Sequence, residues 1–290
     1  MTLWRAAPEL PVFAAGGGMR PLVVRRMAQA RRMRLVVDPR TGEVRLTLPK
    51  RGALRQALAW VEGQRDWVEC ALAALPCPRP IVAGATIPFE DRPLLIDWRP
   101  AAPRRVRHDA EAGALILGGA EESVGPRVLR WLRSEALARL ESETRAMAER
   151  AGVAIGRVTV GDPRSRWGSC SSSGDIRYSW RLILAPPAVR EATVAHEVAH
   201  RLHMDHSARF HAAVRRLLGR EPDAETAWLR AHGAGLYWLG RDSREPSGGR
   251  RSPGGDGGAP RWRTLSSHCS SSRGGASICS SAGGACGPPG

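Results

Sequence analysis

The sequence predicts an α+β protein in which a β-rich segment precedes a mainly helical one. Three observations carry this prediction. Short apolar runs separated by turn residues fill residues 21–119, apolar residues recur at helical spacing after Ser123, and Gly, Ser and Pro dominate after residue 240. We therefore expect a flexible N-terminus over 1–20, a β-rich N-terminal subdomain over 21–119, a second domain over 120–240 and a disordered tail over 241–290.

The β-rich segment contains a hairpin pattern. The apolar runs Met33–Val37 and Val44–Leu48 flank Asp38–Gly42, whose residue types favour a turn. An earlier strand begins at Leu22–Val24, and a helix is expected over Leu54–Leu75, where Pro76 ends it. Further short strands are expected at Ile87–Phe89, Leu94–Trp98 and Leu115–Leu117.

The second domain begins with a long helix. Ser123 can cap its N-terminus, Pro126 fits its first turn and Gly152 ends it. After a strand at Val158–Val160 we expect a hairpin with arms Ser165–Cys170 and Ile176–Leu184. Pro186 and Pro187 then open a helix, and a further helix over Ala208–Leu218 has Ser207 as its N-cap and Gly219 at its end.

The chain is strongly basic, with a net charge of +16. Such a charge is typical of proteins that bind nucleic acid or another anionic surface. However, 43 of the 44 basic residues are Arg, they are scattered along the chain, and no nucleic-acid-binding motif accompanies them. We interpret the charge as mostly compositional, with acidic partners favoured, and nucleic-acid binding stays an alternative without a motif.

Membrane insertion is not expected, because no apolar run reaches the roughly 18 residues of a spanning helix. Pro8, Glu9 and Pro11 interrupt the first twenty residues, so a secretory signal is not expected either. We expect a cytoplasmic protein whose six cysteines are free thiols, and no pattern predicts its oligomeric state.

The helix after Pro187 carries His196-Glu197-Val198-Ala199-His200. The two histidines lie about 40° apart on a helical wheel, so both imidazoles project from one face and can bind one Zn²⁺. Glu197 lies to the side, where it can reach a metal-bound water. A polar face whose histidines only form hydrogen bonds is the alternative interpretation.

A catalytic zinc takes three protein ligands and keeps one open position. His206 is the favoured third ligand, because it lies in the expected reversal between two helices and reproduces the spacing of H-E-x-x-H-x-x-G-x-x-H metalloproteases. That motif has Gly where this chain has His203. His203, on the same helix face, and Glu225, on a later helix, are the alternatives. His211 is expected behind the ligands or at the surface.

Four segments together resemble the bacterial YgjP-like metallopeptidases: Arg166–Cys170, Trp180–Ile183, His196–His200 and His203–Ser207. That family is zincin-type, is grouped with the family 48 metallopeptidases and is related to SprT-like proteases. The resemblance covers about Pro21–Leu239 and implies a zincin-like domain with one Zn²⁺ per chain, held by His196, His200 and His206, and with Glu197 as the catalytic base. Ser179 stands where the family usually has Asn.

The motif and the resemblance predict a zinc metalloendopeptidase that cleaves peptide or protein substrates with a water activated by Glu197. Arg166, Tyr178 and Tyr237 are the candidates for contacts to the oxyanion or the substrate. The hairpin over 165–184 offers an edge strand to an extended peptide. Two other classes stay open: a nucleic-acid-associated protease or DNA/RNA-binding protein that uses the basic surface, and a non-catalytic metal-binding module.

Overall fold

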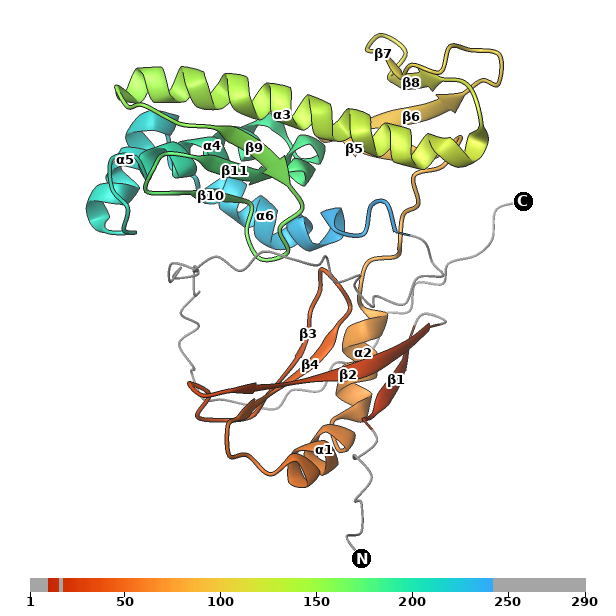
Figure 1. Ribbon diagram of the computed structural model, residues 1–290, viewed down its shortest axis with the longest axis vertical. Helices are drawn as coiled ribbons and strands as arrows, with labels where there is room; N and C mark the ends of the chain where they lie inside the picture. Colours follow the sequence, from red (N-terminus) through yellow and green to blue (C-terminus); the bar gives the residue numbers. More distant parts are fainter. Residues whose placement is uncertain (1–9, 16–17, 242–290) are drawn as a thin grey trace, which may run out of the picture. The chain divides into compact units, whose positions relative to one another are not determined.

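The computed structural model describes residues 10–15 and 18–241 of the 290-residue chain. Helices and sheets are mixed along the chain, which confirms the α+β prediction (Figure 1). The predicted tail lies outside the described residues, except for Arg241. Two separate hydrophobic cores organise the described part, one under residues 12–73 and one under residues 81–239.

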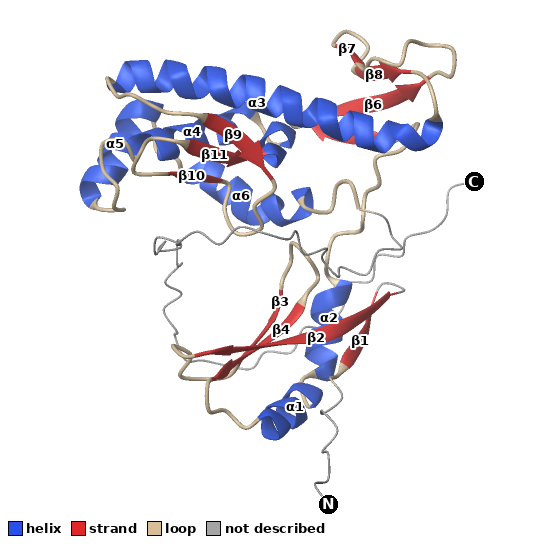
Figure 2. Ribbon diagram, in the orientation of Figure 1, coloured by secondary structure: helices blue, strands red, loops and turns tan. Residues whose placement is uncertain are grey.

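The first core belongs to an N-terminal module, which we define as residues 12–73. Its strands form one sheet in the order β1-β2-β4-β3, in which β2 and β4 run parallel and the other pairs are antiparallel (Figure 2). The strands are β1 (Val12–Ala15), β2 (Gly18–Met27), β3 (Arg34–Val37) and β4 (Val44–Pro49). Alternate residues of β4, namely Val44, Leu46 and Leu48, are buried under the helices.

Two predictions for this module need correction. Residues 12–15 and 18–20, expected in a flexible N-terminus, form strands, because Phe13 has an apolar core to enter. The single helix expected over Leu54–Leu75 is two helices, α1 (Leu54–Glu62) and α2 (Arg65–Ala73). The chain leaves helical geometry at Gln64, after Gly63 caps α1, so that Val61 and Val68 both reach the core.

The second core belongs to a C-terminal module, defined as residues 81–239. It contains a sheet in the order β5-β6-β8-β7, built from β5 (Thr86–Phe89), β6 (Arg92–Trp98), β7 (Arg107–Asp109) and β8 (Ala114–Leu117). Phe89, Ile96 and Leu115 from this sheet pack in the same core as Val128 and Leu132. The two cores therefore divide the chain between α2 and β5, and strands β5 to β8 pack with the helices that follow them.

Helix α3 (Val124–Ala151) runs along the β5–β8 sheet and along a second sheet of the C-terminal module, which is described below (Figure 1). It ends at Gly152, which adopts the predicted left-handed conformation at φ 67°. Ser123 does not cap the helix as expected. It closes a short 3₁₀ turn, η1 (Glu121–Ser123), and its hydroxyl donates to the carbonyl of Ala120.

The second sheet has the order β10-β11-β9 and places β10 at an edge. Its strands are β9 (Val158–Gly161), β10 (Gly168–Cys170) and β11 (Ile176–Ser179). The second arm of the predicted hairpin is too long. Trp180–Leu184 forms a 3₁₀ helix, η2, because the Ser179 hydroxyl accepts a hydrogen bond from the Arg181 N–H and turns the chain. All five residues of η2 are buried, so its composition resembles that of a buried strand.

Three helices complete the module: α4 (Pro187–Ala199), α5 (Ala208–Leu218) and α6 (Asp223–Leu236). Pro187 starts α4 as predicted. The Ser207 hydroxyl accepts from the Phe210 N–H, and Gly219 is left-handed, which confirms both predicted ends of α5. None of the helices in the described residues is long and apolar enough for a membrane span.

A buried arginine fixes α4 against its neighbours. Arg190 is 4% exposed and pairs with Glu143 of α3 at 2.7 Å and with Glu90 of the β5–β6 turn at 3.0 Å. The same turn donates backbone hydrogen bonds to the carbonyls of Ile183 and Leu184 in η2. A buried charge is tolerated only with its partners in place. This network therefore sets the position of α4 relative to α3 and to the β5–β8 sheet.

We predict opposite stability effects for alanine at two glycines. A Cβ at buried Gly118 would lie 1.8 Å from the carbonyl oxygen of Ala102, so Gly118→Ala must move backbone and should lower the free energy of unfolding by about 1–3 kcal/mol. Helical Gly235 has no atom within 4 Å of such a Cβ, so Gly235→Ala should raise it by about 0.5–1 kcal/mol. Urea unfolding measures both, and equal effects would contradict the packing described for residue 118.

Candidate metal centre

The C-terminal end of α4 brings two histidines to one face. His196 lies in the last turn, and His200 is the C-terminal cap. The opposite side of the helix enters the core through Val194 and Val198, which are fully buried. The histidine pair expected from the helical wheel is therefore present, opposite an apolar side that buries the helix.

His206 reaches the same place from the segment between α4 and α5. Its Nε2 lies 3.3 Å from Nε2 of His196, and one ring nitrogen from each of His196, His200 and His206 lies within 4.8 Å of the others. Among the residues that the structure describes, no other group of three His, Cys, Asp or Glu side chains is arranged to hold a metal ion. The structure thus brings together the three histidines that the sequence singled out.

The environment keeps these imidazoles neutral, as metal binding requires. Burial lowers the pKa of His196 to about 3, with further lowering by the neighbouring histidines His200, His206 and His211. Loss of contact with water also lowers the pKa values of His200 and His206. The Nδ1 atom of His200 lies 3.2 Å from the carbonyl oxygen of His203, which can only accept, so Nδ1 carries the proton and Nε2 keeps its lone pair.

A phenyl ring supports the three imidazoles. The ring centroid of Phe210 lies 4.9 Å from that of His196, 4.6 Å from that of His200 and 4.7 Å from that of His206. Phe210 is fully buried and lies in the first turn of α5, three residues after the cap Ser207. The sequence analysis missed this contact, although the cap predicted there fixes the position of Phe210 in the first turn.

Glu197 is 4% exposed and lies against the edge strand β10. A Cβ on Gly168 would lie 2.4 Å from Glu197 Oε1 and 2.7 Å from its Cγ and Cδ, so a glycine is needed for the carboxylate to occupy this position. Burial raises the pKa of Glu197 to about 8, and the charge of Arg166 opposes this rise. The packing of Glu197 therefore explains why a glycine stands at position 168, which the neighbouring residues in the sequence did not reveal.

The three candidates for oxyanion or substrate contacts occupy different surroundings. Arg166 is exposed, two residues before Gly168, and its charge acts on Glu197. The Tyr178 hydroxyl is 3.0 Å from Thr144 Oγ1 in the core, and burial raises its pKa well above the usual value. The Tyr237 hydroxyl donates to the carbonyl of Pro163 at 2.8 Å. The structure therefore does not present either tyrosine hydroxyl toward the histidines.

The alternative third ligands lie outside the histidine group. Glu225 Oε1 accepts from Arg220 Nη2 at 2.8 Å, and its carboxylate is not part of the histidine group. His203 contributes its backbone carbonyl to His200. His211, on α5, is exposed and packs edge-on against Phe210.

The thiol nearest to this centre should be unreactive. Cys170 is 3% exposed, and burial together with the charge of Glu197 raises its pKa to about 11, so roughly one thiol in a thousand is ionised at pH 8. We predict that iodoacetamide labels exposed Cys70 and Cys77 first and that the Cys170 rate climbs about tenfold per pH unit from pH 8 to 10. Peptide mapping by mass spectrometry measures this, with guanidinium-unfolded protein as control. Equal labelling of Cys170 and Cys70 at pH 8 would contradict it.

Comparison with known proteins identifies the family. The family model described as YgjP-like, metallopeptidase domain, matches residues 31–232, which is more than half of the chain. No curated protein and no solved structure matches the chain. The matched range includes the three histidines, Glu197 and Gly168, and membership implies a metal-dependent hydrolase that acts on peptides or proteins. This chain belongs to the YgjP-like metallopeptidase family.

Proposed function

We propose that this chain is a zinc-dependent metalloendopeptidase in which His196, His200 and His206 hold one zinc ion and Glu197 is the general base. The 3.3 Å separation of the Nε2 atoms of His196 and His206 is the observation that carries this proposal. Two imidazole nitrogens that each lie about 2.05 Å from a tetrahedral zinc are about 3.3–3.4 Å apart. The separation therefore fits a shared zinc ion.

The donor set also favours zinc. Neutral imidazoles are common ligands of catalytic zinc, and three of them leave the fourth position for a reactant. Zinc in such a site lowers the pKa of a coordinated water and polarises a carbonyl group. The carbonyl of His203, which orients His200, supplies the supporting hydrogen bond that such ligands usually have.

Glu197 supports the catalytic part of the proposal. It follows His196 directly, is almost fully buried and has a pKa raised to about 8 by that burial. A carboxyl group whose pKa lies near the working pH can both accept and return a proton. In the proposed reaction Glu197 takes a proton from the attacking water and passes it to the leaving amine.

The edge strand β10 is the proposed binding place for an extended substrate. Within the part of the chain that the structure describes, Gly168–Cys170 pairs with β11 on one side only, so its other side offers backbone groups to a peptide. Arg166, which precedes this strand and acts on Glu197, is the proposed contact for the developing oxyanion or the substrate carbonyl. Tyr178 and Tyr237 have their hydroxyl groups engaged elsewhere and give this proposal no support.

We predict that Glu197→Gln keeps one zinc ion per chain and loses about 10²–10⁴-fold in cleavage rate, because the ligands remain and the base is removed. Mass spectrometry of the purified chain measures zinc, and new N-termini in a proteome-derived peptide library measure cleavage. Glu191→Gln is the matched control, because it makes the same change in the N-terminal half of α4, where Glu191 pairs with Arg220. This variant should cleave peptides at the wild-type rate.

Two results would overturn the proposal. Wild-type protein purified without chelators that holds no zinc would remove the metal centre. Zinc-loaded wild type and Glu197→Gln that yield the same peptide products would instead identify a non-catalytic metal-binding module.

We further predict that Gly168→Ala separates metal binding from catalysis. The added methyl group would overlap the carboxylate of Glu197, and a displacement of about 1 Å can cost 10²-fold in rate. We expect one zinc per chain, kcat lowered roughly 10–100-fold and KM changed little. Gly235→Ala, which adds a methyl group in open space, is the control. Unchanged kcat in Gly168→Ala would show that the position of Glu197 does not depend on this glycine.

A further inference from the structure

The positive charge of the chain is concentrated where the mechanism does not use it. Residues 12–73 hold 12 basic and five acidic residues, so about a fifth of the chain carries an excess of seven out of the net charge of +16. Residues 19–37 and 44–61 contain no acidic residue at all. The sequence alone left these residues scattered, and the fold of the N-terminal module gathers them.

Strand directions place six of them at one end of the sheet. In the register of the sheet, Met27 at the end of β2 faces Pro49 at the end of β4, and Arg34 at the start of β3 faces Thr47. The β2–β3 loop and the β4–α1 loop therefore leave the sheet at the same end. We call the basic side chains of this end the basic pole: Arg31, Arg32, Arg34, Lys50, Arg51 and Arg55.

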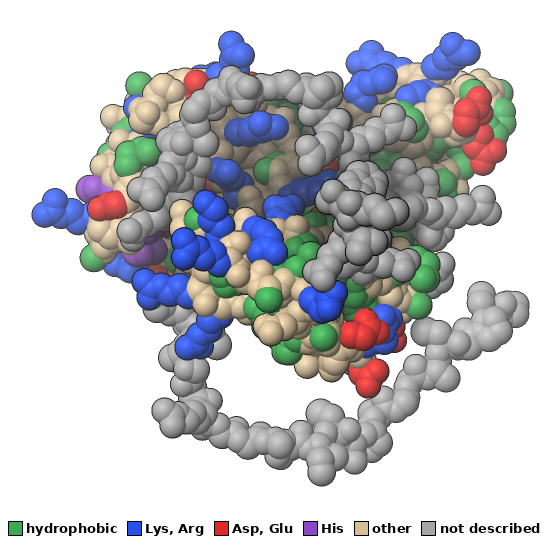
Figure 3. Space-filling model, turned by 60° about the horizontal axis from the view of Figure 1, so that its bottom comes forward, with side chains coloured by type: hydrophobic (Ala, Val, Ile, Leu, Met, Phe, Trp, Pro, Cys, Tyr) green, Lys and Arg blue, Asp and Glu red, His purple; other side chains and the backbone are tan. Residues whose placement is uncertain are grey.

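Arg26 fixes the shape of this end. Its Nη1 donates to the carbonyls of Lys50 at 3.0 Å and Gly52 at 2.8 Å, which ties the β4–α1 loop to the end of β2. All six side chains of the basic pole are exposed, and none of them forms an ion pair with any described residue. Figure 3 looks toward this module and shows Lys and Arg side chains gathered on the near surface, with acidic side chains toward one edge.

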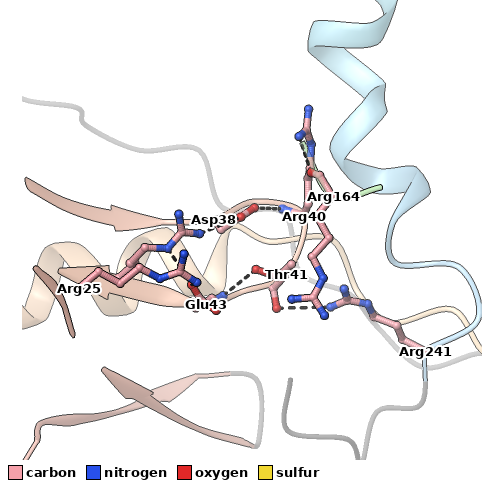
Figure 4. A network of polar contacts seen from close by, with 8 residues as sticks. Arg25, Asp38, Arg40, Thr41, Glu43, Arg164 and Arg241 are labelled. Carbon is pink, nitrogen blue, oxygen red and sulfur yellow. Dashed lines mark hydrogen bonds and ion pairs between the residues drawn. The ribbon is translucent and has the colours of Figure 1, made fainter. Parts of the chain in front are cut away.

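Carboxylates of the sheet lie at its other end. Asp38 and Glu43 belong to the β3–β4 turn, where they pair with Arg45 at 3.4 and 2.7 Å. Figure 4 shows both carboxylates near Arg25 and Arg40. The length of β4 puts this turn about 17 Å from the basic pole. The carboxylates of the sheet therefore pair with arginines at this end, whereas the basic pole has no carboxylate partner among the described residues.

An aromatic hollow lies on the helix-covered face of the same sheet. Leu35 of β3, which is paired with buried Leu46, lines it together with Trp60, Gln64 and Trp67, while the preceding Arg34 points to the opposite face. The two indoles are 39% and 51% exposed, unusual for side chains of this size. Two of the three carboxylates carried by α1 and α2, Glu62 and Glu69, are paired with Arg65, and Asp66 is the third.

We propose that the N-terminal module binds single-stranded nucleic acid, with phosphates on the basic pole and an unstacked base against Trp67 and Trp60. Unpaired cations beside exposed aromatic faces are the combination by which proteins bind single strands, because every base has a face to stack and every nucleotide a charge. A double helix keeps its bases stacked and could use only the basic pole. This binding is independent of the proposed peptidase reaction.

The test measures anisotropy of fluorescein-labelled 12-nucleotide DNA and RNA with the full-length chain. Arg31→Gln/Arg32→Gln/Arg34→Gln should weaken binding at least tenfold at 0.1 M salt and reduce the slope of log K against log salt by about 2, since single strands lose about 0.7 per contact. The matched control Arg104→Gln/Arg105→Gln/Arg107→Gln removes the same charge from exposed positions of the C-terminal module and should change binding less than threefold.

The aromatic part has its own test. Trp67→Ala should weaken single-strand binding about tenfold, Trp67→Phe less than threefold, and neither should affect a duplex of the same sequence. Circular dichroism checks that these surface variants fold. The proposal is overturned if both arginine triples lose affinity equally, if Trp67→Ala has no effect, or if polyglutamate competes as well as the oligonucleotide, which would point to an acidic protein partner.

Discussion

Helix α4 is buried along most of its length, and the contacts that surround it organise the rest of the C-terminal module. Nine of its thirteen residues are buried, including Arg190 and Glu197, which carry charges that water would otherwise solvate. Charged groups in such a place must find partners or shift their pKa values. Arg190 pairs with Glu143 and Glu90, and these pairs join α3 and the β5–β8 sheet to α4. For Glu197, burial raises the pKa to about 8, although the charge of Arg166 opposes this rise.

The same burial explains how the histidines become a metal centre. His196 cannot be protonated at neutral pH in this environment, so its lone pair is available for a cation. His206 completes the group only because the chain reverses between α4 and α5, and the cap at Ser207 and the ring of Phe210 fix that reversal. Packing therefore positions the ligands, and the glycine at 168 leaves room for the carboxylate beside them.

Local signals predicted the parts of the fold that depend on local chemistry. The ends of α5, the left-handed Gly152 and the hairpin of β3 and β4 followed from caps, turns and alternation. The helical period also placed His196 and His200 on one face. Predictions failed where tertiary packing decided the outcome: the break at Gly63–Gln64 lets two short helices share one core, and buried η2 resembled a strand in composition.

Contacts between distant segments could not be predicted from a single sequence. Nothing near Gly168 indicates that Glu197, 29 residues later, will lie on it, and nothing near Tyr178 indicates that its hydroxyl will face Thr144. The distribution of positive charge also could not be predicted from the sequence. Arginines that look scattered in the sequence meet at one end of a sheet because β2 and β4 run parallel.

X-ray absorption at the zinc edge tests the central claim most directly, because it reports the atoms around the metal in the intact chain. The account predicts a first shell of three imidazole nitrogens and one further light atom, at about 2.0–2.1 Å, with the imidazole signal reduced by about one third in His206→Ala. A sulfur at about 2.3 Å, or an unchanged spectrum in His206→Ala, would contradict the three-histidine centre.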